Sequence, residues 1–132
     1  MTVSWSATST SGRFVPTEVH SDVHALAQHV ERLRSAGSGY LEVRRSDDDY
    51  PVVALGFRSG WAVVHVLPDA DTTLLMAGNG SLAPGDVADI PVMDDVVAFD
   101  GAYVMSVHAA WSALLRFVRT ARTTVLGDLV EL

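Results

Sequence analysis

Five histidines are the first residues in this sequence whose chemistry could support a function. His20 and His24 are four residues apart, and on a helix this spacing would place both side chains on one face, where they can chelate a metal ion. A zinc-protease motif also requires a Glu directly after the first His, and Ser21 stands there instead. No carboxylate or thiolate is placed to complete such a site. We therefore predict no metal site and no cofactor.

His65 is a second candidate. It lies between Val64 and Val66 in an apolar run, which is typical of a half-buried strand residue or an interface residue. The alternative is that His65 acts as a catalytic base or binds a small molecule. Either role would need a concave pocket with convergent polar groups. The sequence has no cysteine and no G-x-S-x-G nucleophile motif, and the glycine-rich segment 78–81 lacks the Lys of a phosphate loop. We predict that the protein is not an enzyme and has no catalytic residues.

Aspartates gather at two predicted turns, Asp47, Asp48 and Asp49 at the first and Asp69 and Asp71 at the second. A calcium loop alternates its ligands and ends with a Glu about a dozen residues on, and nothing closes this one in that way. The two groups are either solvated turns or an acidic surface offered to a basic partner. Alternate turns of a meander emerge at the same edge of a sheet, so we expect both groups at one edge.

Trp61 follows directly after a predicted turn, so it is either a core residue or an anchor for a partner protein. The sequence therefore predicts a partner-binding set that combines this side chain with the turn carboxylates: Asp47, Asp48, Asp49, Trp61, Asp69 and Asp71.

The charge balance agrees with a basic partner. The chain has 16 acidic and 9 basic residues, all of the latter Arg, for a net charge of −7. Such acidity argues against binding to nucleic acid or to an anionic membrane surface, although it also serves solubility. No apolar run approaches the roughly 20 residues that span a bilayer, and the first residues lack the pattern of a secretory signal. We expect a soluble, cytoplasmic protein.

Two helices and a series of short strands would have to position these residues. Residues 21–36 and 106–121 carry apolar side chains at helical spacing, with Ser21 and Ser106 as the expected N-caps. We interpret residues 1–17 as an edge strand and a loop. Apolar runs with turn residues between them predict strands at 40–45, 52–58, 61–67, 73–77, 87–92 and 96–99, and a closing piece at 123–126 or 129–132.

Short sequential strands without intervening helices predict an antiparallel meander. The expected fold is therefore α+β: a meander sheet of five to six strands, with an N-terminal and a C-terminal helix packed on one face. The length of 132 residues and the absence of a linker indicate one domain over residues 1–132.

The order of these pieces resembles immunity protein family 1 of bacterial polymorphic toxin systems, which is common in actinobacteria. The similarity runs over residues 16–132, with the entry segment 16–19, the strand 40–43, the small-residue strand end 76–78 and the helix 106–120. The hairpin 51–65 is most similar to the family. The chain departs from it at 121–124, where the family has Gly-x-x-Pro, and at 128–130, where a Trp is common. An abundance of Ala, Val, Gly and Asp, with no Lys, is also typical of a GC-rich bacterial genome.

The resemblance implies a small cytoplasmic immunity protein that binds and neutralises a cognate toxin domain encoded nearby. Toxins of such systems are often basic nucleases or nucleic-acid deaminases. The alternative is a secretion chaperone or adaptor of the small acidic α+β type, which would be an obligate dimer. For the immunity protein a monomer is favoured.

Overall fold

The computed structural model describes residues 2–132 and has an α+β architecture. Its two α-helices are α1 (Val23–Ala36) and α2 (Val107–Thr120), and its 3₁₀ turns are η1 (Gly101–Tyr103) and η2 (Thr123–Leu126). The strands are β1 (Thr2–Thr8), β2 (Phe14–Asp22), β3 (Ser38–Arg45), β4 (Val52–Arg58), β5 (Trp61–Leu67), β6 (Leu74–Met76), β7 (Val87–Val92), β8 (Asp95–Asp100), β9 (Met105–Ser106) and β10 (Leu129–Glu131).

The main sheet is larger than the five to six strands that we predicted. Eight strands form it in the order β10-β6-β5-β4-β3-β1-β2, with β9 paired to β5, and β7 and β8 form a separate two-stranded sheet. All of these pairings are antiparallel. The predicted meander is present as β3 to β6, and Arg58 pairs with Trp61 across the two-residue turn at 59–60. The strands that were not predicted are β2 and β9, whereas β10 corresponds to the closing piece predicted at 129–132. The predicted strands 87–92 and 96–99 pair with each other and do not join the main sheet.

The N-terminal region differs most from the prediction. Strand β1 is not an edge strand, because it pairs with both β2 and β3, and residues 14–22 form β2 instead of a loop and a helix entry. Helix α1 therefore follows two strands, and α2 is followed by η2 and β10, so the helices are not terminal. The N-cap of α1 is Asp22 and not the predicted Ser21, because the helix begins at Val23, and the Asp22 carboxylate accepts the Ala25 N–H at 2.9 Å.

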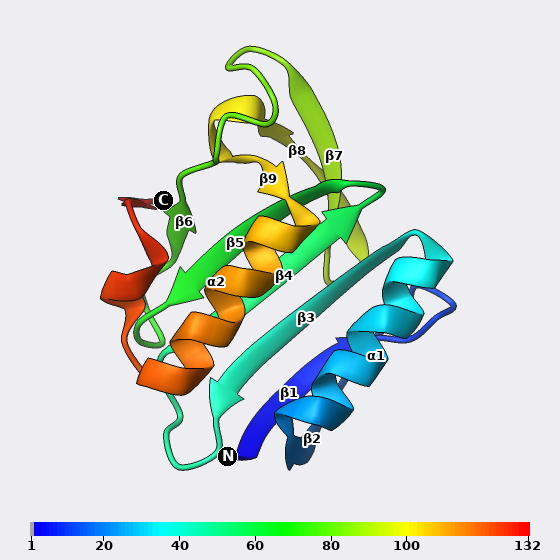
Figure 1. Ribbon diagram of the computed structural model, residues 1–132, viewed down its shortest axis with the longest axis vertical. Helices are drawn as coiled ribbons and strands as arrows, with labels where there is room; N and C mark the ends of the chain where they lie inside the picture. The colour runs from blue at the N-terminus through cyan, green and yellow to red at the C-terminus, as the bar shows by residue number, and fades with distance from the viewer. Residues whose placement is uncertain (1) are drawn as a thin grey trace.

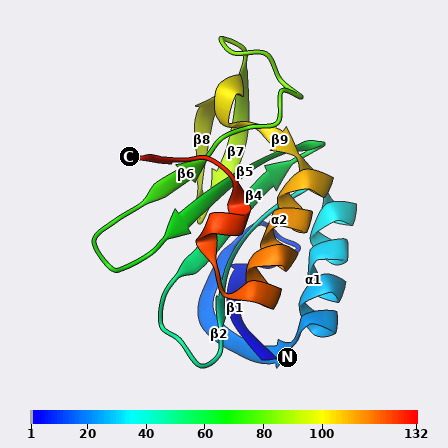
Figure 2. The ribbon, with the colours of Figure 1, turned by 60° about the vertical axis from the view of Figure 1, so that its left-hand side comes forward.

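Both helices lie on one face of the main sheet (Figures 1 and 2). Leu26, Val30 and Leu33 of α1 are buried there, with the α2 stripe that includes Leu114 and Phe117. They meet the alternate strand residues of β1, β3, β4 and β5, which form with them one buried apolar cluster. Ser106 is the N-cap of α2, as predicted, and its hydroxyl accepts the Ala109 N–H at 3.1 Å. Neither helix of residues 2–132 is long and apolar enough to span a membrane.

The opposite face of the sheet is only partly covered. The hairpin β7–β8 packs across it and forms a smaller buried cluster that includes Val63, Ile90 and Val104. Strand β7 passes so close to Gly56 that a Cβ at this position would lie 2.3 Å from the carbonyl oxygen of Pro91. A glycine in β4 therefore permits this crossing. On this face Glu42 of β3 and His65 of β5 remain partly exposed.

Candidate functional site

The five aspartates that we predicted as partner-binding lie at one end of the main sheet. Residues 46–51 connect β3 to β4 and residues 68–73 connect β5 to β6, and the pairing of Val52 with Leu67 places both connections at the same end. Both loops leave this end in Figures 1 and 2. All five aspartate side chains are exposed. We call this surface, made of Asp47, Asp48, Asp49, Asp69 and Asp71, the acidic end.

The second turn of the acidic end is held in shape by its own carboxylate. Asp69 accepts the backbone N–H of Asp71 through Oδ1 at 2.9 Å, which is an Asx turn. This backbone hydrogen bond, assisted by one from the Thr72 side chain, lowers the pKa of Asp69 below its ordinary value. The carboxylate is therefore ionised at neutral pH. Within residues 2–132, no group of three or more His, Asp or Glu side chains is arranged to hold a metal ion.

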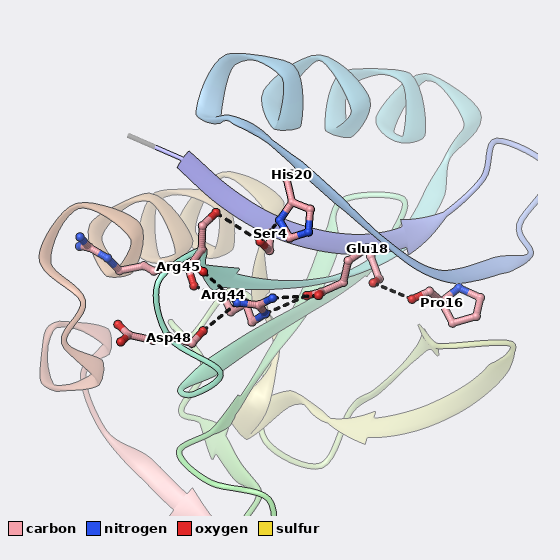
Figure 3. Close-up of polar contacts among 9 residues, drawn as sticks. Ser4, Pro16, Glu18, His20, Arg44, Arg45 and Asp48 are labelled. Atoms are coloured by element: carbon pink, nitrogen blue, oxygen red, sulfur yellow. Dashed lines mark hydrogen bonds and ion pairs between the residues drawn. The ribbon is translucent and has the colours of Figure 1, made fainter.

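The first turn is fixed by Arg44 of β3 (Figure 3). The guanidinium donates two hydrogen bonds to the Glu18 carboxylate of β2, at 2.8 and 2.9 Å, and a third to the carbonyl oxygen of Asp48 at 2.9 Å. The Arg44 hydrogen bond lowers the pKa of Glu18. Arg44 thus bonds the backbone of the turn at Asp48 while its guanidinium is paired with Glu18.

Trp61 does not join the acidic end. It is the first residue of β5, whereas Leu67, at the acidic end, is the last. Six strand steps separate them, which is about 20 Å. The indole is half-buried and packs against the cluster under the β7–β8 hairpin. The structure thus brings together five of the six predicted binding residues and leaves Trp61 at the opposite end of the sheet.

The histidines of the N-terminal region are also separated. His20 and His24 cannot share a helix face, because His20 lies in β2 and only His24 is in α1. The imidazole of His20 bonds the Ser4 hydroxyl, with 2.5 Å between Nδ1 and Oγ (Figure 3). Ser4 is fully buried, so this pair offers no accessible nucleophile. His29 Nε2 bonds the Thr8 carbonyl at 2.9 Å, which is a structural role.

His65 lines a pocket of about 250 Å³ on the partly covered face. Two other titratable side chains line it, Tyr40 and Glu42 of β3, and the Tyr40 hydroxyl donates to Glu42 Oε2 at 2.7 Å. Burial lowers the pKa of His65, so the ring is neutral at pH 7. Neither Tyr40 nor Glu42 was predicted as a site residue. The signal in the sequence was their i, i+2 spacing in a strand, which places both on one face.

Neither the known family models nor the curated protein sequences contain a match to this chain. The physical properties of two surface features then provide the basis for a functional proposal. They are the acidic end, where charge is concentrated and exposed, and the pocket of Tyr40, Glu42 and His65, where polar groups converge inside apolar walls.

Proposed function

We propose that this protein is an immunity protein that binds a cognate toxin domain and neutralises it by protein–protein interaction in the cytoplasm of the cell that makes both. The observation that carries the proposal is the acidic end, where five exposed carboxylates from two turns lie at one end of a sheet. The net charge of the whole chain, −7, has the same sign as the charge of this surface.

A basic partner is the natural complement of such a surface. Nucleases and nucleic-acid deaminases need cationic surfaces, because they must neutralise phosphates when they bind their substrates. An acidic protein that covers such a surface competes with the nucleic acid directly. Opposite charges on the two proteins also accelerate their encounter, an effect that weakens as salt is added.

The rigidity of the two turns supports this role. The Asx turn at Asp69 and the hydrogen bond from Arg44 to the Asp48 carbonyl order the backbone of the two turns. A backbone that is already ordered loses less conformational entropy on binding, so more of the interaction energy appears as affinity. The proposed mechanism requires no catalytic step by this chain.

A rescue assay tests the proposal. The C-terminal domain encoded by the gene immediately upstream is expressed in a bacterium, alone and together with this protein. We expect growth to stop with that domain alone and to return when this protein is added, and we expect the two to co-purify as a complex of one copy each. A neighbouring domain that is harmless, or that kills in both conditions, would refute the immunity proposal, and a stable homodimer of this protein would favour the chaperone alternative.

Charge substitutions then test the acidic end itself. Asp47, Asp48 and Asp49 are changed together to Asn, and the matched control changes three exposed aspartates near the β7–β8 hairpin, Asp86, Asp89 and Asp95, to Asn. Both variants lose three negative charges. We expect the first to slow association with the toxin about tenfold or more at low salt, and the control to slow it much less. Equal effects would assign the attraction to net charge and remove the acidic end from the interface.

A further inference from the structure

Two polar residues that line the pocket, Glu42 and His65, belong to one row of residues across three strands. Glu42 of β3 pairs with Ala54 of β4, and Ala54 pairs with His65 of β5, so the three side chains lie side by side on the partly covered face. Ala54 is itself buried, whereas Glu42 and His65 both line the pocket. The Cα atoms of these two residues are two strand spacings apart, which is about 10 Å.

The walls of the pocket are mostly apolar. Leu67, Val92 and Met93 line it with Leu132, and Thr73 adds a polar group. Strand β7 crosses the sheet at Gly56 and closes the pocket on one side. On the other side Leu67 and Thr73 border the turn that carries Asp69 and Asp71. The pocket therefore lies next to the turn of the acidic end that carries these two aspartates.

The charges around the pocket select for a cation. The Tyr40 hydroxyl bonds Glu42, and burial, together with this bond, raises the pKa of Tyr40 above its ordinary value, so the phenol stays a neutral donor. His65 is neutral at pH 7 and its ring stands edge-on to Phe99, with 5.5 Å between centroids. Arg44, on the same strand face as Glu42, is already paired with Glu18. Among the described residues that line the pocket, Glu42 is thus the one acidic side chain, and none is Arg or Lys.

A ligand for this site needs a cationic head and an apolar stem. A guanidinium fits better than an ammonium, because it is planar, less strongly hydrated, able to give two hydrogen bonds to one carboxylate and able to lie against aromatic rings. The methylene stem of an arginine would lie along the apolar wall of Leu67 and Met93. Entry from the acidic end would keep the cation near negative charge along its whole path.

We infer that the pocket between Glu42 and His65 receives an arginine side chain of the toxin domain, with Glu42 as its ionic partner and His65 as a neutral acceptor beside it. This inference rests on the proposed function, because the arginine belongs to the partner protein. It adds an anchor to the interface: the acidic end attracts the toxin, and the pocket fixes one side chain of it in place.

The first test uses this protein alone, with N-acetyl-arginine amide as the probe and N-acetyl-citrulline amide, its neutral analogue, as the control. Both are titrated while the imidazole resonances of His65 are followed by NMR. We expect saturable shifts with the arginine probe, with a dissociation constant in the millimolar range that is ordinary for one small group, and none with citrulline. Equal shifts with both probes would overturn the inference. So would the absence of shifts with the arginine probe at concentrations up to about ten times the expected dissociation constant.

A pair of matched variants locates the binding. Glu42→Gln removes the ionic partner, and Glu31→Gln removes the same charge from an exposed position on α1. We expect Glu42→Gln to weaken binding of the arginine probe at least fivefold, and Glu31→Gln to leave it unchanged. Equal behaviour of the two variants would overturn the inference. The comparison of arginine with citrulline on the unaltered chain stays decisive even if Glu42→Gln does not fold.

The complex with the toxin separates this inference from the proposed function. With the toxin, Glu42→Gln should lower affinity about tenfold or more, which is typical of a buried interface anchor. If the toxin binds Glu42→Gln as tightly as the unaltered chain, the pocket is not the anchor and the immunity proposal stands. If the neighbouring domain is not a toxin but the arginine probe still binds as expected, the immunity proposal fails and the pocket keeps its specificity for arginine.

Discussion

The two faces of the main sheet are covered in different ways. On one face, α1 and α2 lay wide apolar stripes over β1, β3, β4 and β5, and the resulting cluster is sealed from water. On the other, the hairpin β7–β8 crosses only part of the sheet and buries a smaller cluster. The polar side chains of Tyr40, Glu42 and His65 lie on this second face, next to the end where the five aspartates are exposed.

This difference separates stability from recognition. A face under two amphipathic helices can contribute a large apolar core, but it has no room for a charged group that is not paired. A face under a narrow hairpin contributes less buried area and leaves positions where a carboxylate and an imidazole stay within reach of solvent. The strands serve both purposes because their side chains alternate between the faces.

The largest effect should come from the helix-covered face. Phe117 of α2 is fully buried in the larger cluster, so Phe117→Ala should lower the free energy of unfolding by about 3–5 kcal/mol through lost burial and the cavity left behind. Phe99→Ala, on the hairpin-covered face, removes the same groups from a partly exposed site and should cost clearly less. Urea unfolding measures both. Equal losses would mean that the two faces contribute alike to stability.

An intermediate effect should follow from crowding the hairpin. Gly56→Ala places a Cβ against the Pro91 carbonyl and Ile90, so β7 must move away, and we expect a loss of about 1–3 kcal/mol. Gly60→Ala is the matched control, since a Cβ there meets nothing within 4 Å. Hydrogen exchange should show the loss of protection concentrated in β7 and β8. If α2 loses protection equally, the hairpin is not an independent cover for its face.

The smallest effect is a pH dependence that belongs to His65. Burial lowers its pKa below the ordinary value of 6.5, so as the pH falls through 6.5 the unfolded chain takes up a proton that the folded chain does not. Stability should therefore decrease below pH 6.5, until the pH reaches the folded-state pKa of His65. Glu42 and Tyr40 are the other titratable side chains lining the same pocket, and the raised pKa of Tyr40 keeps its phenol neutral in this range.

Urea unfolding at pH 7.5 and 5.5 measures this effect on the unaltered chain and on His65→Phe. The decrease in stability should be smaller in His65→Phe. His108→Gln, at an exposed position of α2, should behave as the unaltered chain does. If His65→Phe retains the whole decrease in stability, protonation of His65 is not the cause of the pH dependence.

Local patterns were enough to predict much of the fold. Ser106 followed by apolar residues at helical spacing predicts α2 to within a residue, because a cap and a stripe are properties of consecutive residues. The β4–β5 hairpin follows in the same way from two apolar runs around Ser59 and Gly60. The meander places the five aspartates at one end, and the same strand count, carried to Trp61, would have placed that residue at the other.

The features missed by the sequence analysis depend on partners far along the chain. Strand β2 has a mostly exposed, polar sequence, and it is a strand because β1 pairs with it, so residues 14–22 were interpreted as a loop and a helix entry. Because of this error His20 was expected next to the first helix, whereas it lies in β2. The row of Glu42, Ala54 and His65 depends on the register of three strands, and register is set by tertiary packing.

Strand β2, nine residues long, is one of the two edges of the main sheet, and an unpaired edge can template the addition of strands from other chains. Two features of β2 oppose such growth. Pro16 has no N–H to offer a new strand, and the register against β1 shifts between Trp5 and Ala7, which bends the edge out of the flat geometry that stacking requires. We therefore expect the irregularity of β2 to limit fibrillar aggregation of the protein at high concentration.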